Sequence, residues 1–111
     1  MLIRPAAGAD VDAIFNLIEI YAPKAIVLKR SRENIAEYLG NFIVADLDGK
    51  VVGCAALRDF GNHLLEIRSL VIDPNYQGRG IGRSLVQFLI QKGRETRDSW
   101  RIFTLTYEHK F

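Results

Sequence analysis

Three alternating glycines occur in residues 77 to 84, Gln-Gly-Arg-Gly-Ile-Gly-Arg-Ser, where the residue types and spacing suggest chemistry. The apolar run after them predicts a helix from about residue 82 to 95. Glycines at a helix start let the backbone approach a ligand closely, and the unpaired N–H groups there favour an anion such as phosphate. A plain flexible turn has a similar composition. The loop alone therefore leaves two alternatives open, a phosphate cradle and a turn.

The spacing of these glycines departs from the common nucleotide-binding motifs. A dinucleotide fingerprint reads Gly-x-Gly-x-x-Gly directly after a strand, whereas residues 73 to 77 separate this loop from the preceding predicted strand. A P-loop needs a second glycine five residues after the first, and counting from Gly78 that place is taken by Arg83. Both nucleotide-binding interpretations are therefore disfavoured.

The composition predicts one soluble domain over residues 1 to 111, because 49% hydrophobic content is enough for one modest core. Cys54 lies in an apolar run, which favours an inert buried thiol, and two histidines without ligand spacing make a metal site unexpected. A net charge of +2 gives no reason to expect nucleic acid as a partner. No signal peptide or membrane-spanning run is recognised, so we expect a cytoplasmic protein.

Periodicity and turn residues predict the elements that position the loop. Asp10 is expected to cap a first helix that ends before Pro23, and Ser31 a second helix closed by Gly40. Asp48-Gly49 predicts a tight hairpin. The expected strands cover residues 2–4, 42–47, 50–59, 64–72 and 101–106. This order places the glycine loop after the fourth strand of a mixed sheet.

The loop fits the pattern Gln/Arg-x-x-Gly-x-Gly/Ala, with Asp73-Pro74 shortly before it. On this motif and on element order, nearly the whole chain resembles the GNAT superfamily of acetyl-CoA-dependent N-acetyltransferases. Four segments are similar to the short N-acetylglutamate synthases of arginine biosynthesis: PKAIVLKRSRENI, DGKVVGCAALRDF, LLEIRSLVIDPNYQGRGIG and RIFTLTYEHKF. The resemblance implies an α/β (α+β) fold, the GNAT acyl-CoA N-acyltransferase fold, with a mixed, mostly antiparallel sheet flanked by helices.

The resemblance also implies acetyl-CoA as cosubstrate, without a metal. The pyrophosphate is then expected on the backbone of the glycine loop, and the pantetheine arm along the backbone of the preceding strand. The residues so implied are Gln77, Gly78, Arg79, Gly80, Ile81, Gly82 and Arg83 in the loop and Leu70, Val71 and Ile72 in the strand.

Acetyl transfer needs a group that removes a proton from the attacking amine. A glutamate eleven residues before the first motif position acts as general base in part of the family, which implies this role for Glu66. Period-two alternation puts Glu66 on one strand face with Arg68 and Leu70, so a simple ion pair with Arg68 stays an alternative. Tyr107 is the candidate proton donor to the leaving thiolate, with a surface or core tyrosine as the alternative.

If the acceptor is L-glutamate, guanidinium groups suit its carboxylates best. Arg68 is the leading candidate for substrate binding, followed by Lys29 and Arg30, whose other interpretation is a solvated charged face. Two alternatives remain for the whole protein. One is transfer to another small amine, amino acid or protein N-terminus, and the other is a catalytically silent acyl-CoA-binding module.

The resemblance stops at the fifth strand, and GNAT domains normally continue with a helix and two further strands. We therefore expect a shortened form of the fold whose last strand, residues 101–106, has an exposed edge. A homodimer or higher oligomer with an interface over residues 101 to 111 is the expected way to cover it.

Overall fold

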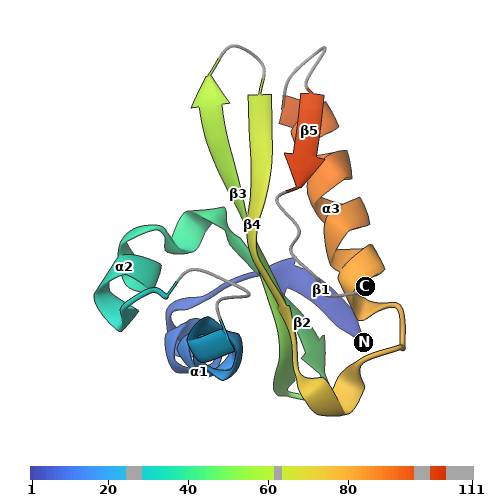
Figure 1. Ribbon diagram of the computed structural model, residues 1–111. Coiled ribbons are helices and arrows are strands. Elements are labelled where there is room, and N and C mark those ends of the chain that lie inside the picture. Colours follow the sequence, from blue (N-terminus) through green and yellow to red (C-terminus); the bar gives the residue numbers. More distant parts are fainter. Residues whose placement is uncertain (25–28, 62–63, 97–100, 105–111) are drawn as a thin grey trace.

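The computed structural model describes residues 1–24, 29–61, 64–96 and 101–104, which form one sheet with helices on both faces (Figure 1). The strands lie in chain order across the sheet: β1 (Leu2–Pro5), β2 (Phe42–Leu47), β3 (Lys50–Gly61), β4 (Leu64–Ile72) and β5 (Arg101–Thr104). The α-helices are α1 (Val11–Tyr21), α2 (Arg32–Glu37) and α3 (Ile81–Thr96). Short 3-10 turns are η1 (Gly8–Asp10), η2 (Ala22–Lys24), η3 (Leu39–Asn41) and η4 (Pro74–Tyr76). All neighbouring strands run antiparallel except β4 and β5, which confirms the mixed α+β architecture.

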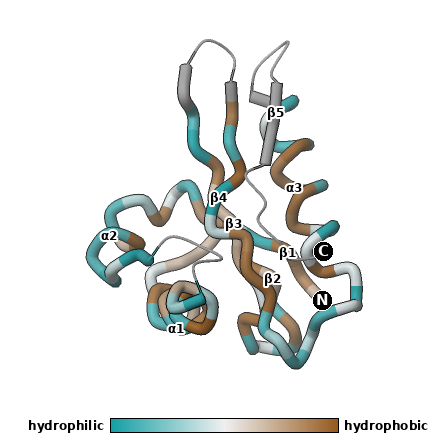
Figure 2. The backbone as a smooth tube through the Cα atoms, in the orientation of Figure 1, coloured by the Kyte–Doolittle hydropathy of each residue, from teal (hydrophilic) through white to brown (hydrophobic). Residues whose placement is uncertain are grey.

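The sheet separates two hydrophobic cores. On one face Leu85 and Leu89 of α3 pack against side chains of the central strands. On the other, Ile14 and Ile18 of α1 pack with Ile35 of α2. Figure 2 shows the same division in hydropathy, with hydrophobic central strands and a largely hydrophilic α2. Because both faces of β4 are covered over much of its length, this strand is a rigid base for a site.

The predicted Ser31 cap and the predicted Asp48-Gly49 turn are confirmed. The Oγ atom of Ser31 accepts the backbone N–H of Asn34 at 3.1 Å, so it caps α2. Asp48 and Gly49 adopt left-handed conformations, with φ of 50° and 90°, in the turn between β2 and β3. No helix within the described ranges is long and apolar enough to cross a membrane.

The role predicted for Asp10 was wrong. It stands just before α1, but its carboxylate caps no N–H group of that helix in the described part of the chain. Instead it accepts the backbone N–H of Ala7 at 2.7 Å and two hydrogen bonds from the Arg4 guanidinium, at 2.8 and 3.1 Å. The hydrogen bonds from Arg4 lower the pKa of Asp10. A charge-assisted bidentate pair is stronger than a neutral cap, so the carboxylate turns toward Arg4.

A bulge interrupts β4 at Ser69. The register against β3 shifts between Cys54 and Ala56, and Ser69 has a φ of 53°, which is unusual for a residue other than glycine. The extra residue reverses the alternation of faces along the strand. The predicted common face of Glu66, Arg68 and Leu70 was therefore wrong for Leu70, which packs in the core on the α3 side.

Candidate active site

The glycine loop has a backbone that only glycine adopts readily. Gly78 and Gly80 have φ values of 77° and 76°. An ideal Cβ atom at either position would meet no heavy atom within 4 Å among the described residues. These glycines are therefore not required by packing with the protein, and the space over the loop is open to a ligand.

The start of α3 adds hydrogen-bond donors to this loop. The carbonyl of Gly80 accepts the backbone N–H of Ser84 at 3.0 Å, which is the first bond of the helix, and also the Ser84 hydroxyl at 3.0 Å. The N–H groups of Ile81, Gly82 and Arg83 come before that bond, so helix geometry gives them no carbonyl partner. Three such donors at the positive end of a 16-residue helix favour an anion.

Basic side chains flank the loop. The guanidinium of Arg79 lies 5.0 Å from the centre of the Tyr76 ring, and Lys50 Nζ lies 5.0 Å from the same ring. Arg83 is exposed in the first turn of α3. These cations add to the positive potential of the helix start, so the predicted cofactor-binding stretch has the electrostatics that phosphate needs.

Beside the loop, one edge of β4 has no strand paired with it among the described residues. The pairing of β4 with β5 covers Leu64 to Ile67, and Figure 1 shows β5 beside that part of β4 only. The backbone N–H of Asp73 donates to Val52 of β3 at 2.8 Å, so alternation turns the peptide groups of Val71 toward β3 as well. Those of Leu70 and Ile72 face the side without a described partner strand. Backbone contacts predicted for residues 70 to 72 would thus fall on Leu70 and on the N–H group of Ile72, because the Ile72 carbonyl already accepts hydrogen bonds from Tyr21 and Gln77.

A polar junction holds the end of this strand. The hydroxyl of Tyr21, at the end of α1, donates to the carbonyl of Ile72 at 2.7 Å. The side-chain amide of Gln77 donates to the Tyr21 oxygen at 3.0 Å and to the same carbonyl at 3.3 Å. The Gln77 side chain therefore fixes the start of the loop to β4, and its Nε2 donors are used within this junction.

Replacing Tyr21 with phenylalanine is expected to weaken coenzyme A binding about three- to tenfold, because one hydrogen bond that fixes the strand end and the loop is lost. Isothermal titration calorimetry with coenzyme A would measure the change. Tyr38→Phe removes an exposed tyrosine hydroxyl elsewhere and serves as the matched control. An affinity equal to that of the unchanged protein would show that the junction does not shape the loop.

Glu66 and Arg68 form an ion pair on β4, on the face that carries α1 and α2. The Nε atom of Arg68 donates to Oε1 of Glu66. Only 3% of Glu66 is exposed, whereas Arg68 is half-buried. The structure thus contains the ion pair that was the alternative explanation for Glu66. It also places this carboxylate one residue before Ile67, the last β4 residue in the described pairing with β5, so the two interpretations are compatible.

Arg30 joins this pair from the segment between α1 and α2. Its Nε atom donates to Asn34 Oδ1 at 2.7 Å, its Nη1 atom donates to Ser69 Oγ at 3.2 Å, and its guanidinium lies 4.9 Å from the centre of the Phe42 ring. Burial lowers the pKa of Arg30, and the nearby charge of Arg68 lowers it further. Arg30 has no ion-pair partner among the described residues. A half-buried cation of this kind suits an anionic ligand.

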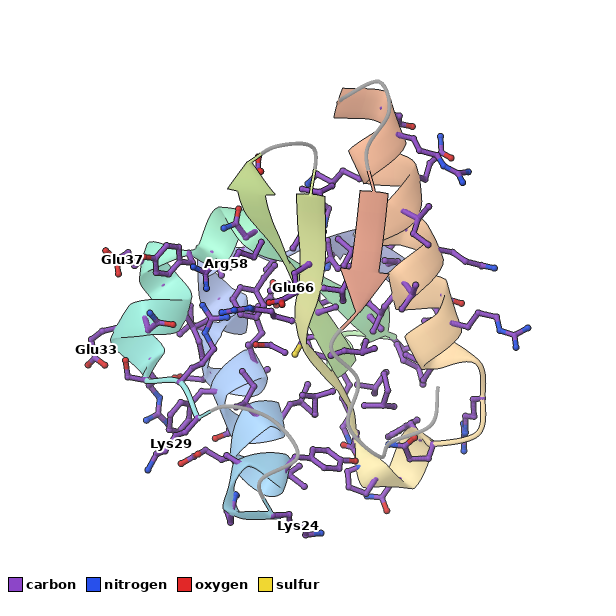
Figure 3. The ribbon with its side chains drawn as sticks, turned by 45° about the horizontal axis from the view of Figure 1, so that its top comes forward. Lys24, Lys29, Glu33, Glu37, Arg58 and Glu66 are labelled. Atoms are coloured by element: carbon purple, nitrogen blue, oxygen red, sulfur yellow. The ribbon has the colours of Figure 1, made fainter. Side chains whose placement is uncertain are left out.

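Lys29 and Tyr107 are the other predicted substrate-binding and catalytic residues. Lys29 is exposed, and Figure 3 shows it well away from Glu66. Tyr107 lies outside the described residues. Cys54 neighbours the bulge, where its Sγ atom donates to the Ser69 carbonyl at 3.5 Å, and burial raises the pKa of its thiol to about 12. The prediction of an inert buried thiol is confirmed.

Sequence reasoning missed Tyr21, Asn34 and Ser69. Tyr21 contacts a carbonyl 51 residues away, and Ser69 is 39 residues from Arg30. Contacts between residues so far apart in the chain produce no local pattern in the sequence. Asn34 could have been found, because it lies four residues after Arg30 and in the first turn of the helix that Ser31 caps.

Known proteins resemble this chain over most of its length. Residues 11–109 match the model of the acetyltransferase (GNAT) family. "Uncharacterized N-acetyltransferase CT2212" of Chlorobaculum tepidum is 46% identical over 77% of the chain and 55% of its own length. An "amino-acid acetyltransferase" of Mycobacterium tuberculosis is 41% identical over 99% of the chain and 64% of its own length. The chain therefore spans little more than half to two thirds of these relatives.

A solved structure extends the comparison to three dimensions. N-acetylglutamate synthase from Neisseria gonorrhoeae, complexed with coenzyme A and N-acetyl-glutamate, superposes with a TM-score of 0.91 at 34% identity. The match covers 96% of this chain and 25% of that one. The arrangement of sheet and helices described above is thus shared with a protein that holds both molecules.

Proposed function

The chain belongs to the GNAT acetyltransferase family, and from that premise we propose that it transfers the acetyl group of acetyl-CoA to the α-amine of L-glutamate. The observation that carries the proposal is the placement of two sites along β4. The glycine loop follows the end of the strand that lies beyond the described pairing with β5, and the Glu66–Arg68 pair lies on its other half. One strand thus connects an anion site to a charged face suited to an amino acid.

The residues at the loop fit the phosphates of coenzyme A. Open space over Gly78 and Gly80, free helix-start donors and the charges of Arg79 and Arg83 all favour a pyrophosphate there. The peptide groups of Leu70 and the N–H group of Ile72, on the edge of β4 that has no described partner strand, can bond the amides of the pantetheine arm. Acetyl-CoA supplies the thioester carbon that the amine attacks.

The charged face fits an acidic amino acid. Arg30 is half-buried and lacks a carboxylate partner in the described part of the chain, and Arg68 lies close enough to lower its pKa. An acceptor with carboxylates would compensate the charge of Arg30, whereas a polyamine would add to it. This charge balance supports glutamate over a cationic amine as the acceptor.

Glu66 is the proposed proton acceptor. At neutral pH an amino acid's amine is mostly protonated, so the proton must leave before or during attack on the thioester. Glu66 is buried, and its carboxylate is held by Arg68 on the half of β4 that pairs with β5. A carboxylate fixed in this way can take the proton directly or through a water molecule.

A thiol-release assay with acetyl-CoA and a panel of amines tests the proposal. The panel would contain L-glutamate, L-glutamine, other amino acids, a polyamine and a peptide with a free N-terminus. Release that depends on L-glutamate is the expected result. Thiol release with other amines but not with L-glutamate would show that the acceptor is a different amine. Coenzyme A binding without any thiol release would show that the protein is a binding module.

Replacing Arg30 with lysine should raise the KM for glutamate about tenfold and leave the KM for acetyl-CoA unchanged. Lysine keeps the charge but loses the planar fork that pairs with a carboxylate. Steady-state kinetics with each substrate varied in turn measures the two constants. Arg32→Lys, at an exposed arginine paired with Asp12, is the matched control. Equal changes in both constants would assign Arg30 a structural role instead.

A further inference from the structure

The bulge in β4 brings Ser69 to Arg30, and we propose that Ser69 is a positioning residue for this arginine, which binds a carboxylate of the acceptor. The inference rests on the proposed function, because it explains how the same site prepares Arg30 for L-glutamate. The Oγ atom of Ser69 accepts a hydrogen bond from Arg30 Nη1 at 3.2 Å, although the two residues are 39 positions apart. The hydroxyl thus connects a central strand to the segment before α2.

The direction of the Ser69 side chain depends on the bulge. Ile67 packs in the core on the α3 side, and strict alternation would turn Ser69 to that side too. The hydroxyl instead contacts Arg30, which lies over Phe42 in the core on the side of α1 and α2. Glycine adopts a φ of 53° with less strain than serine. A strained residue other than glycine at this place indicates a role for its side chain.

The guanidinium of Arg30 is held at two nitrogen atoms and over an aromatic ring. Nε donates to Asn34 Oδ1 at 2.7 Å, Nη1 donates to Ser69, and the centre of the buried Phe42 ring lies 4.9 Å away. A guanidinium has five N–H donors, so three remain after these two bonds, and two of the three are on Nη2. Both acceptors are neutral, so they fix the plane of the group without compensating its charge.

A guanidinium fixed in this way is prepared to bind a carboxylate. A mobile arginine side chain loses rotamer entropy when it pairs, whereas one that is already fixed loses less. The remaining donors of Arg30 can form the two parallel bonds that a carboxylate accepts. The Ser69 hydroxyl should therefore affect binding of the acceptor and leave binding at the glycine loop unaffected.

Ser69→Gly tests this role, because glycine lacks the hydroxyl but suits the backbone. The KM for L-glutamate should rise about three- to tenfold, since Arg30 loses one of the bonds that fix its plane. The KM for acetyl-CoA should stay unchanged, and so should kcat. The unfolding temperature should change little, because glycine readily adopts the φ of Ser69.

Two further variants separate the effect of the hydroxyl from that of the backbone. Ser69→Ala lacks the same hydroxyl but keeps the strain, so it should raise the KM for glutamate equally and lower the unfolding temperature more. Asp48→Gly is the matched control, because Asp48 has a φ of 50° but lies in the turn between β2 and β3. It should leave the KM for glutamate unchanged. A KM that follows the unfolding temperature instead of the hydroxyl would overturn the positioning role.

Binding of the product gives a readout independent of turnover. Calorimetry on the coenzyme A complex should show that Ser69→Gly binds N-acetyl-L-glutamate about three- to tenfold more weakly. In an Arg30→Met background the same substitution should change the dissociation constant less than about twofold, because Ser69 acts through Arg30. Additive effects of the two substitutions would show that Ser69 does not act through this arginine and would overturn the proposal.

Two kinds of failure can be told apart. An unchanged KM for glutamate in Ser69→Gly, or equal changes in the KM values for glutamate and acetyl-CoA, would overturn the role of Ser69 while glutamate acetylation stands. An unchanged protein that neither acetylates glutamate nor binds N-acetyl-L-glutamate would overturn both this role and the proposed function.

Discussion

Replacing Gly80 with valine is expected to weaken coenzyme A binding at least about one hundredfold while the fold is retained. Two effects combine in this variant. Valine is β-branched and does not readily adopt the φ of 76° found at Gly80, so the loop must change its backbone. Its side chain would also fill the open space in front of the helix-start donors. Losing two charge-assisted bonds, each worth about 1.5–3 kcal/mol, gives an effect of this size, which calorimetry would measure.

The matched control for this variant is Gly49→Val. Gly49 has a φ of 90° and equally open surroundings, but it lies in the turn between β2 and β3. The Gly49→Val variant should strain the backbone to a similar degree and so lower the unfolding temperature. Its affinity for coenzyme A should stay unchanged. If Gly80→Val binds coenzyme A as the unchanged protein does, the loop is a structural turn.

Glu66→Gln should lower turnover on the order of one hundredfold at neutral pH, because the amide cannot take the amine's proton. The loss should shrink as pH rises toward the pKa of the amine, where more of the acceptor arrives unprotonated. Glutamine also removes the carboxylate partner of the half-buried Arg68, so a lower unfolding temperature is expected. A pH–rate profile for each protein measures the effect on catalysis separately from that on stability.

Glu37→Gln, at an exposed glutamate on α2, controls for the loss of a negative charge near the cluster. Its pH–rate profile should match that of the unchanged protein. A profile for Glu66→Gln with normal height and shape would leave the carboxylate with a structural role, as the partner of Arg68 alone.

Most of the fold was predictable because its elements carry local patterns. The apolar positions of α1 and α3, the Ser31 cap and the Asp48-Gly49 turn each depend on residues close in sequence. The glycine loop was predictable as an anion site for the same reason. Its placement beside the half of β4 that lies beyond the described pairing with β5 followed from the resemblance to GNAT proteins, since spacing alone left a plain turn equally open.

The parts that could not be predicted depend on contacts between distant segments. The bulge at Ser69 contains no glycine that would indicate it in the sequence. Strict alternation along the strand therefore predicted the wrong face for Leu70. Asp10 looked like a helix cap because its competitor for the carboxylate, Arg4, becomes a neighbour only through the fold. The contact of Ser69 with Arg30 likewise joins residues that are far apart in the chain.

The bulge at Ser69 also divides β4 into two halves, and the alternation of side chains between the two sheet faces is out of step by one residue from one half to the other. Before it, Glu66 and Arg68 turn toward α1 and α2, and after it Leu70 and Ile72 turn toward α3. A continuous pleat would send one of these pairs to the other face. The types of side chain in each half can therefore vary. The number of residues between Glu66 and Ile72 must stay the same for both halves to keep their faces. Adding or deleting one residue there would invert one half of the strand and separate the acceptor face from the cofactor edge.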